Sequence, residues 1–304
     1  MIWTKKENYK PYEFIATDIT SNCNLRCPFC ANDFSNIKGN TLMTESTLDK
    51  VLTLLPLASP SSYLFSCAFE PTLHPEFVSY LEKIKEEHAP KVFFTTNLAK
   101  KISDDEIERL SRLKIAFINI SLDSFVPKTF EEMRCGAKFS IFIDNLERFV
   151  SIFEMEPNAP RIRFTTVVLQ SNVDEISDIV EKNFEQYHPF GHQVRFIYEG
   201  YHYSKEWKQK NLISNDDWAK LIEQCAKSSY SYNVTPPPAQ YFPDDNAAYS
   251  KIAKKVIPPT PPFGLSISSD GTVFIYGQEK IKYNINEIDD PYTFFNNKRK
   301  SFQI

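Results

Sequence analysis

The chain has 304 residues, of which 42% are hydrophobic and 24% charged, and its formal net charge is -4. This length suffices for one large domain, with or without a small appendage. A mildly acidic chain is not built to coat nucleic acid or an anionic membrane. The N-terminus lacks the apolar run of a secretory signal, and no segment approaches the about 18 apolar residues that span a bilayer. We therefore expect a cytoplasmic protein with reduced thiols, and neither membrane nor nucleic acid as a partner.

Strand-like and helix-like segments alternate over the first two thirds of the chain. The predicted strands are residues 14–20, 62–71, 91–97, 115–123, 161–170 and 192–200. The predicted helices between them are residues 44–56, 75–87, 104–113, 139–153 and 173–186, with Thr44 as an N-cap and Pro75 in a first turn. This pattern predicts an α/β fold, a partial (β/α)6 barrel of parallel strands. Functional sites of such sheets lie at the C-terminal ends of the strands.

After about residue 200 the alternation weakens. An aromatic segment comes first, and a helix is predicted after it over residues 215–227. Two proline-rich connectors follow this helix, at residues 235–245 and 257–263. An Asp270-Gly271 turn between alternating apolar residues predicts a β-hairpin over residues 265–276. We expect a barrel domain over residues 1–205 and a C-terminal extension over residues 206–304.

Three of the six cysteines, Cys23, Cys27 and Cys30, occupy eight consecutive positions directly after the first predicted strand. Structural zinc prefers four ligands. A redox dithiol would use Cys27 and Cys30 but leave Cys23 without a role. Burial of three cysteines in a polar loop would be unusual. The fourth alternative is an iron–sulfur cluster, in which three thiolates leave one iron open for a small molecule.

The Cys-x-x-x-Cys-x-x-Cys motif and its place after a first strand resemble the radical S-adenosylmethionine (radical SAM) superfamily. The resemblance implies that Cys23, Cys27 and Cys30 ligate one [4Fe-4S] cluster, whose open iron binds the methionine part of S-adenosylmethionine. It also implies reductive cleavage to a 5'-deoxyadenosyl radical, which abstracts a substrate hydrogen. In such an enzyme the cofactor carries the chemistry, while the protein orients the reacting atoms and excludes water.

Further segments resemble the same family. Residues 65–77 (FSCAFEPTLHPEF) resemble its Gly-Gly-Glu-Pro segment, although Cys67, Ala68 and Phe69 replace the glycines. The resemblance implies that Glu70 binds the ammonium group of the methionine part of S-adenosylmethionine through a charge-assisted contact. Residues 93–101 (FFTTNLAKK) resemble the third-strand segment and place Asn97 at the barrel mouth, with Leu98 where glycine is usual.

Residues 118–139 resemble the fourth strand of the family and the loop that follows it. The resemblance places Ser121 and Asp123 on the ribose and carboxylate side of the cofactor and pairs Arg134 with the methionine carboxylate. Val168 is expected to pack on the adenine, although core packing explains that residue equally well. The full set of expected cofactor-binding residues is Phe29, Glu70, Asn97, Ser121, Asp123, Arg134 and Val168.

The other three cysteines are Cys67, Cys135 and Cys225. Free cysteines are usually small buried hydrophobes, but any of the three is also a candidate catalytic hydrogen donor to a substrate radical. Tyr198, Tyr201, His202 and Tyr203 follow the sixth predicted strand. These rings suit either a polar substrate or ordinary loop packing.

The C-terminal segment resembles the SPASM and twitch extensions of the family, which carry auxiliary clusters. No cysteine follows Cys225, so we expect one cluster only and a redox-neutral reaction such as epimerisation, rearrangement or elimination. The resemblance implies a carbohydrate, nucleotide-sugar or peptide substrate and an external reductant such as flavodoxin or ferredoxin. Two alternatives remain: a dehydrogenase with an external electron acceptor, and a non-catalytic iron–sulfur or electron-transfer protein.

Overall fold

The computed structural model of the protein describes residues 10–37, 39–66, 68–197, 202–230, 232–235, 263–276 and 281–301. Strands and helices alternate up to residue 195, as the sequence predicts. In chain order these elements are β1 (Phe14–Thr17), α1 (Glu45–Leu52), β2 (Tyr63–Phe65), α2 (Phe77–Glu82), β3 (Val92–Thr96), α3 (Asp104–Ser111), β4 (Phe117–Ser121), α4 (Pro127–Met133), α5 (Phe139–Met155), β5 (Arg161–Val167), α6 (Ile176–Tyr187) and β6 (Gly191–Arg195).

The later elements include both edge strands of the sheet. They are α7 (Lys205–Asn211), α8 (Asn215–Lys227), β7 (Tyr232–Thr235), β8 (Gly264–Ile267), β9 (Thr272–Ile275), β10 (Lys282–Asn284) and α10 (Pro291–Ser301). Short 3-10 helices lie at Leu55–Leu57, Pro71–Leu73, Ala89–Lys91, Val173–Glu175 and Ile285–Glu287.

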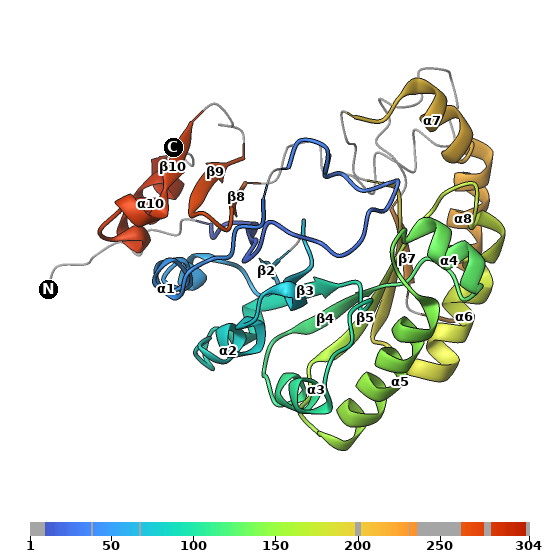
Figure 1. The fold of residues 1–304 in the computed structure, drawn as a ribbon, viewed down its shortest axis with the longest axis horizontal. Coiled ribbons are helices and arrows are strands. Elements are labelled where there is room, and N and C mark those ends of the chain that lie inside the picture. The colour runs from blue at the N-terminus through green and yellow to red at the C-terminus, as the bar shows by residue number, and fades with distance from the viewer. Residues whose placement is uncertain are drawn as a thin grey trace, which may run out of the picture.

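The described strands form one mostly parallel sheet in the order β10-β9-β8-β1-β2-β3-β4-β5-β6-β7. Neighbours from β8 through β1 to β7 are parallel, whereas β9 and β10 are antiparallel additions. Figure 1 shows the sheet curving, with α2, α3, α5 and α6 along its outer side. The predicted α/β class and partial barrel are confirmed. Among the helices that the structure describes, none combines the length and apolar character needed to cross a membrane.

Residues beyond 205 contribute strands to both sides of the barrel sheet. The pairing of β7 with β6 and of β8 with β1 carries the sheet across the predicted domain boundary, and that boundary stays a prediction. The strand β7 and the helices α4, α7 and α10 were absent from the predicted elements. The predicted hairpin is confirmed as β8 and β9, and Gly271 has the positive φ (85°) that its turn requires.

Two predicted element boundaries in the second strand–helix unit are wrong. The strand ends at Phe65, because Ser66 has a φ of 71° and turns the chain out of the extended conformation. The helix begins at Phe77 and excludes Pro75, because the chain first forms the 3-10 turn at residues 71–73. His74 Nδ1 then accepts a hydrogen bond from the backbone N–H of Glu76 (3.1 Å).

Apolar side chains pack between the sheet and its helices in two clusters. The larger cluster joins β1–β5 to α1, α2, α3 and α5 and includes fully buried Phe94 and Phe149. The smaller one lies around α6 and α8 and includes fully buried Trp218. Burial of this apolar surface on the outer side of the sheet stabilises the barrel and leaves its inner face for polar side chains.

The C-terminal extension is joined to α1 by a charged contact. Lys50 Nζ donates hydrogen bonds to the carbonyls of Asn286 and Ile288, both at 2.8 Å, and to that of Ile285 at 3.4 Å. Thr47 Oγ1 donates to Asn286 Oδ1 at 2.9 Å. These contacts hold the turn after β10 against the first helix of the barrel.

We predict that Lys50→Met lowers the free energy of unfolding by about 1.5–3 kcal/mol, because three carbonyls lose a charged donor. Urea denaturation measures this change. Lys128→Met, an exposed position on α4, is the control and should change stability by less than about 0.5 kcal/mol. Equal stability of the two variants would contradict the proposed role of Lys50.

Candidate functional site

The three clustered cysteines lie on the loop between β1 and α1, at the C-terminal end of β1. We call residues 23–30 the cysteine loop. Asn97 Nδ2, which follows β3, donates to Asn24 Oδ1 (3.0 Å), and the Arg26 N–H donates to the carbonyl of Cys135 (2.8 Å). A Cβ at Gly136, whose φ is 99°, would lie 3.3 Å from the Asn24 carbonyl oxygen. Glycine at this position therefore lets the loop pack closely on the segment after α4.

The thiols of the cysteine loop are partly buried and act on one another electrostatically. Burial raises the pKa of all three, to about 12 for Cys23 and about 11 for Cys27. The guanidinium of Arg134 partly offsets this rise in pKa for Cys27 and Cys30. The other two thiolates raise the pKa of Cys23 further, so the three sulfurs are within electrostatic reach of one another.

The donor set fits an iron–sulfur cluster. Within the described residues, no three Cys, His, Asp or Glu side chains converge as the ligands of a single metal ion would. A [4Fe-4S] cluster does not demand such convergence, since each thiolate binds a different iron atom. Three thiols on one short loop, with a guanidinium nearby to offset negative charge, meet its requirements.

Glu70 follows β2 and has a buried carboxylate. Its Oε1 accepts hydrogen bonds from the hydroxyls of Thr72 and Thr96, both at 2.8 Å, and its Oε2 accepts from the Asn97 N–H at 2.8 Å. Burial raises the pKa of Glu70, and these hydrogen bonds act against the rise. The hydrogen-bond donors from Thr72, Thr96 and Asn97 are neutral groups that fix the carboxylate in place. A carboxylate held in this way can receive a cationic group as a charge-assisted partner.

Arg134 lies at the C-terminal end of α4 and forms a buried ion pair with Asp123. Its Nε donates to Asp123 Oδ2 at 2.6 Å, and Asp123 Oδ1 accepts from the Val167 N–H at 2.8 Å. The guanidinium carbon of Arg134 lies 5.4 Å from the centroid of the Phe29 ring. Both oxygens of Asp123 therefore have protein partners, and Asp123 orients Arg134 toward the cysteine loop. A contact between Asp123 and the cofactor stays a prediction.

A cavity of about 400 Å³ opens inside the barrel beside these residues. Phe29, Cys30 and Arg134 line it near the cysteine loop. Its wall is built from alternate residues of the strands, because successive side chains of a strand point to opposite faces. These are Leu64, Phe93, Thr95, Asn119, Ser121, Arg163, Thr165, Val167, Gln193 and Arg195.

The predicted cofactor-binding residues occupy different positions around this cavity. Phe29, Ser121 and Arg134 line it, whereas Glu70 and Asn97 lie behind Cys23, to which Asn97 Nδ2 comes within 3.7 Å. Val168 is buried among Phe29 and the core residues around α6, and Val167 lines the cavity in its place. Strand alternation separates these two valines, and an adenine contact of Val168 stays a prediction.

The candidate hydrogen donors lie away from the cavity wall or outside the described residues. Cys225 on α8 donates from its thiol to the carbonyl of Tyr232 on β7 (3.2 Å), and Cys135 is exposed. Cys67 lies outside the described residues. Neither described candidate is among the cavity-lining residues.

The aromatic segment after β6 is described only in part. Tyr198 and Tyr201 lie outside the described residues. His202 and Tyr203 contact each other, with ring centroids 4.4 Å apart, and Tyr203 stacks on Trp207 at 4.6 Å. Burial raises the pKa of Tyr203, and the thiolates of Cys30 and Cys27 raise it further, which places this phenol near the cysteine loop.

The sequence interpretation missed most of the cavity wall, including Asn119, Arg163, Gln193 and Arg195. The available signal was the alternation of polar and apolar residues along the fifth and sixth predicted strands. Polar residues on a strand buried on both faces indicate a lumen. Without the register, that alternation could not tell which residues of neighbouring strands face one another.

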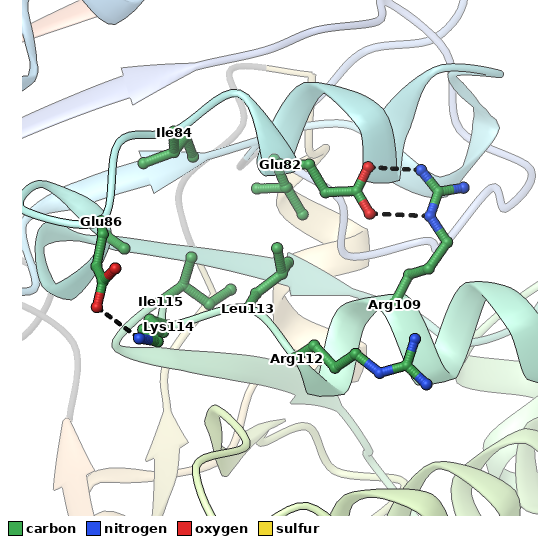
Figure 2. Close-up of a pocket in the computed structure, with 10 residues that line it drawn as sticks. Glu82, Ile84, Glu86, Arg109, Arg112, Leu113, Lys114 and Ile115 are labelled. Carbon is green, nitrogen blue, oxygen red and sulfur yellow. Dashed lines mark hydrogen bonds and ion pairs between the residues drawn. The ribbon is translucent and has the colours of Figure 1, made fainter.

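A second hollow of about 260 Å³ lies between α2 and α3, near the start of β4. Figure 2 shows Arg109 beside Glu82 and Lys114 beside Glu86 at this hollow, while Arg112 pairs with Glu108, four residues before it (3.0 Å). Arg109 holds the carboxylate of Glu82 with two hydrogen bonds, at 2.9 and 2.7 Å, and Lys114 pairs with Glu86. This hollow is at the opposite ends of the strands from the cysteine loop, and its ion pairs are surface contacts of modest strength.

Comparison with known proteins identifies relatives over part of the chain. Residues 17–182 match the family model of the Radical SAM superfamily. GTP 3',8-cyclase of Clostridium botulinum (strain Hall) is 26% identical over 188 residues, which cover 60% of this chain and 55% of that protein. GTP 3',8-cyclase of Haemophilus influenzae (strain PittEE) is 26% identical over 229 residues, 68% of this chain and 62% of that protein. The chain spans less than two thirds of the length of these relatives.

Solved structures share the fold over most of the chain. SuiB of Streptococcus suis bound to S-adenosylmethionine superimposes with a TM-score of 0.66 at 16% identity, covering 94% of this chain and 66% of that chain. The anSMEcpe structure with bound AdoMet gives a TM-score of 0.64 at 20% identity, covering 95% and 82%. Because the family model matches more than half of the residues, the chain belongs to the radical SAM superfamily, whose members use a [4Fe-4S] cluster and S-adenosylmethionine.

Proposed function

We propose that Cys23, Cys27 and Cys30 hold one [4Fe-4S] cluster and that S-adenosylmethionine binds beside it, at the rim of the cavity. Once bound and reduced by one electron, these groups supply a 5'-deoxyadenosyl radical for hydrogen abstraction from a substrate carbon. The cysteine loop holds the cluster against the barrel mouth. Asn97 fixes that loop through Asn24 and fixes Glu70 through its backbone N–H.

The buried carboxylate of Glu70 carries this proposal, because Thr72, Thr96 and Asn97 hold it with hydrogen bonds while burial raises its pKa. The ammonium of the methionine part would give it a cationic partner. Arg134, oriented by Asp123, would donate to the methionine carboxylate. Phe29, Asn97, Ser121 and Val168 complete the proposed cofactor contacts.

The proposed substrate is a polar molecule that occupies the cavity, where threonine, asparagine, glutamine and arginine side chains line the wall. The names of the related cyclases refer to GTP, a small molecule. A solved structure of SuiB contains a bound precursor peptide. Proteins similar to this chain are thus associated with both classes of ligand. With no cysteine after Cys225 for an auxiliary cluster, we propose a redox-neutral reaction. An external protein such as flavodoxin or ferredoxin would supply the electron.

Replacing Cys23, Cys27 or Cys30 singly by Ala should abolish the absorbance at about 400 nm. Each variant should also lose most of its iron, of which we expect about four atoms per chain in the wild type. The physical reason is that three thiolates are the only protein anchors of the proposed cluster. Iron analysis after anaerobic reconstitution measures this loss. The double variant Cys135→Ala, Cys225→Ala is the control and should keep its iron. Full iron in all three single variants would refute the ligand assignment.

Glu70→Gln should weaken S-adenosylmethionine binding about 10- to 100-fold, because a charge-assisted contact becomes a neutral one. Equilibrium dialysis of the reconstituted protein measures the dissociation constant. Glu76→Gln, an exposed carboxylate six positions along the chain, is the matched control and should bind as the wild type does. Unchanged binding by Glu70→Gln would remove Glu70 from the cofactor site.

A further inference from the structure

The hydroxyl of Tyr203, two positions before α7, is a buried polar group that has no hydrogen-bond partner among the described residues. Tyr203 is 8% exposed and its oxygen is buried, so bulk water does not reach the hydroxyl. Buried polar groups in folded proteins are almost always hydrogen-bonded, and an exception points to a partner such as a bound group. The function proposed above does not use this hydroxyl.

Packing fixes the ring of Tyr203 beside the cysteine loop. The ring stacks on that of Trp207, with centroids 4.6 Å apart and planes at 17°, and its centroid lies 4.4 Å from that of His202. Tyr203 also belongs to the buried apolar cluster that contains Phe29, and Cys27 packs against the same cluster. Because the phenol oxygen is attached rigidly to the ring, these contacts also determine where the oxygen lies.

The phenol oxygen of Tyr203 is within electrostatic reach of two thiols of the cysteine loop. Burial raises the pKa of Tyr203, and the thiolates of Cys30 and then Cys27 raise it further. A phenol with a raised pKa stays protonated near neutral pH, so this group is present as a hydrogen-bond donor.

The residue before Tyr203 lies near the end of the same loop. Hydrogen bonds from Ser35 lower the pKa of Asp33, and the imidazole of His202 contributes to this lowering. Asp33 comes three positions after Cys30. Two successive residues that precede α7 are therefore close to the cysteine loop and the residues directly after it.

Sulfur is the acceptor that the proposed cluster would offer to this hydroxyl. Hydrogen bonds to the sulfurs of an iron–sulfur cluster are among the features that set its reduction potential. Reduction adds an electron and so increases the negative charge on the sulfurs. A hydrogen bond donated to them therefore stabilises the reduced state more than the oxidised state, and the reduction potential rises.

We propose that the hydroxyl of Tyr203 donates a hydrogen bond to a sulfur on the Cys30 side of the cluster and thereby makes the cluster easier to reduce. The external reductant supplies the electron, and no proton leaves the hydroxyl. Tyr203 is not among the residues that line the cavity, so its role concerns the cofactor and not the substrate. This inference rests on the proposed function, since it requires that the cysteine loop hold the cluster.

The test compares the anaerobically reconstituted wild type with Tyr203→Phe, which removes only the hydroxyl. A redox titration followed by electron paramagnetic resonance measures the midpoint potential of the cluster. At a given potential the ratio of reduced to oxidised cluster should fall about tenfold, which is a shift of about 59 mV to more negative potential for a one-electron couple. Iron analysis of the same samples separates this shift from loss of the cluster.

Replacement of Tyr203 by ortho-fluorotyrosine gives a result of opposite sign. Fluorine keeps the ring and its stacking on Trp207 but makes the hydroxyl a stronger donor, so the midpoint potential should rise above that of the wild type. This variant also tests the inference if Tyr203→Phe does not fold.

Tyr230→Phe is the matched control, because it makes the same change in another stacked tyrosine. The ring of Tyr230 stacks on that of Phe184 with centroids 5.0 Å apart. Burial raises the pKa of Tyr230, and the carboxylates of Glu185 and Glu181 raise it further. Its hydroxyl thus faces carboxylates, and the control should keep the wild-type midpoint potential.

A wild-type midpoint potential in both Tyr203 variants, with iron retained, would overturn the hydrogen bond to sulfur. Formation of 5'-deoxyadenosine from S-adenosylmethionine on reduction is measured in the wild-type preparation. If it forms while the Tyr203 variants keep the wild-type potential, only this inference fails. If the potentials shift as expected but no 5'-deoxyadenosine forms, the hydrogen bond stands and the proposed radical function fails.

Discussion

The site depends on one residue, Asn97, which joins two parts of the barrel rim that are far apart in sequence. Its backbone N–H holds the Glu70 carboxylate, and its side-chain amide holds Asn24 of the cysteine loop. Each contact involves a polar group buried or half-buried at a strand end, where an unmade hydrogen bond would be costly. The same residue therefore sets where the carboxylate lies relative to the sulfurs, and with it the space available to a cofactor.

Two non-glycine residues beside this network, Ser66 (φ 71°) and Leu98 (φ 49°), have left-handed backbone conformations. Such conformations cost about 1–3 kcal/mol each and persist where surrounding contacts determine them. The Ser66 N–H donates to the Thr17 carbonyl (2.6 Å), and the Leu98 carbonyl accepts from Asn145 Nδ2 (2.8 Å). Hydrogen bonds thus maintain at Leu98 the geometry for which the family resemblance leads one to expect glycine.

Charge is arranged differently inside and outside the barrel. The hollow between α2 and α3 contains opposite charges that neutralise each other (Figure 2), and the pair of Arg134 and Asp123 does the same at the cavity rim. Arg163 and Arg195 line the inner wall together with hydroxyl and amide side chains. The outer ion pair of Arg109 and Glu82 joins the helices α2 and α3.

The sequence by itself determined the features that arise from local pattern. Strand–helix alternation predicted the parallel barrel, Asp270-Gly271 predicted the hairpin, and three close cysteines predicted a thiolate site after the first strand. Periodicity and turn chemistry act over a few residues, so a single sequence suffices to find them. The place of the site at the strand ends followed from the parallel topology.

Only the tertiary structure decided which side chains meet. In the folded chain Asp123 pairs with Arg134. Val167 lines the cavity, whereas Val168 does not, and Arg163 and Arg195 lie on the same cavity wall. The tertiary structure also placed β7 and β8 on opposite sides of the barrel sheet. These outcomes depend on register and sheet curvature, which arise from packing between segments distant in sequence. A shift of one residue in register would turn each of these side chains to the opposite face.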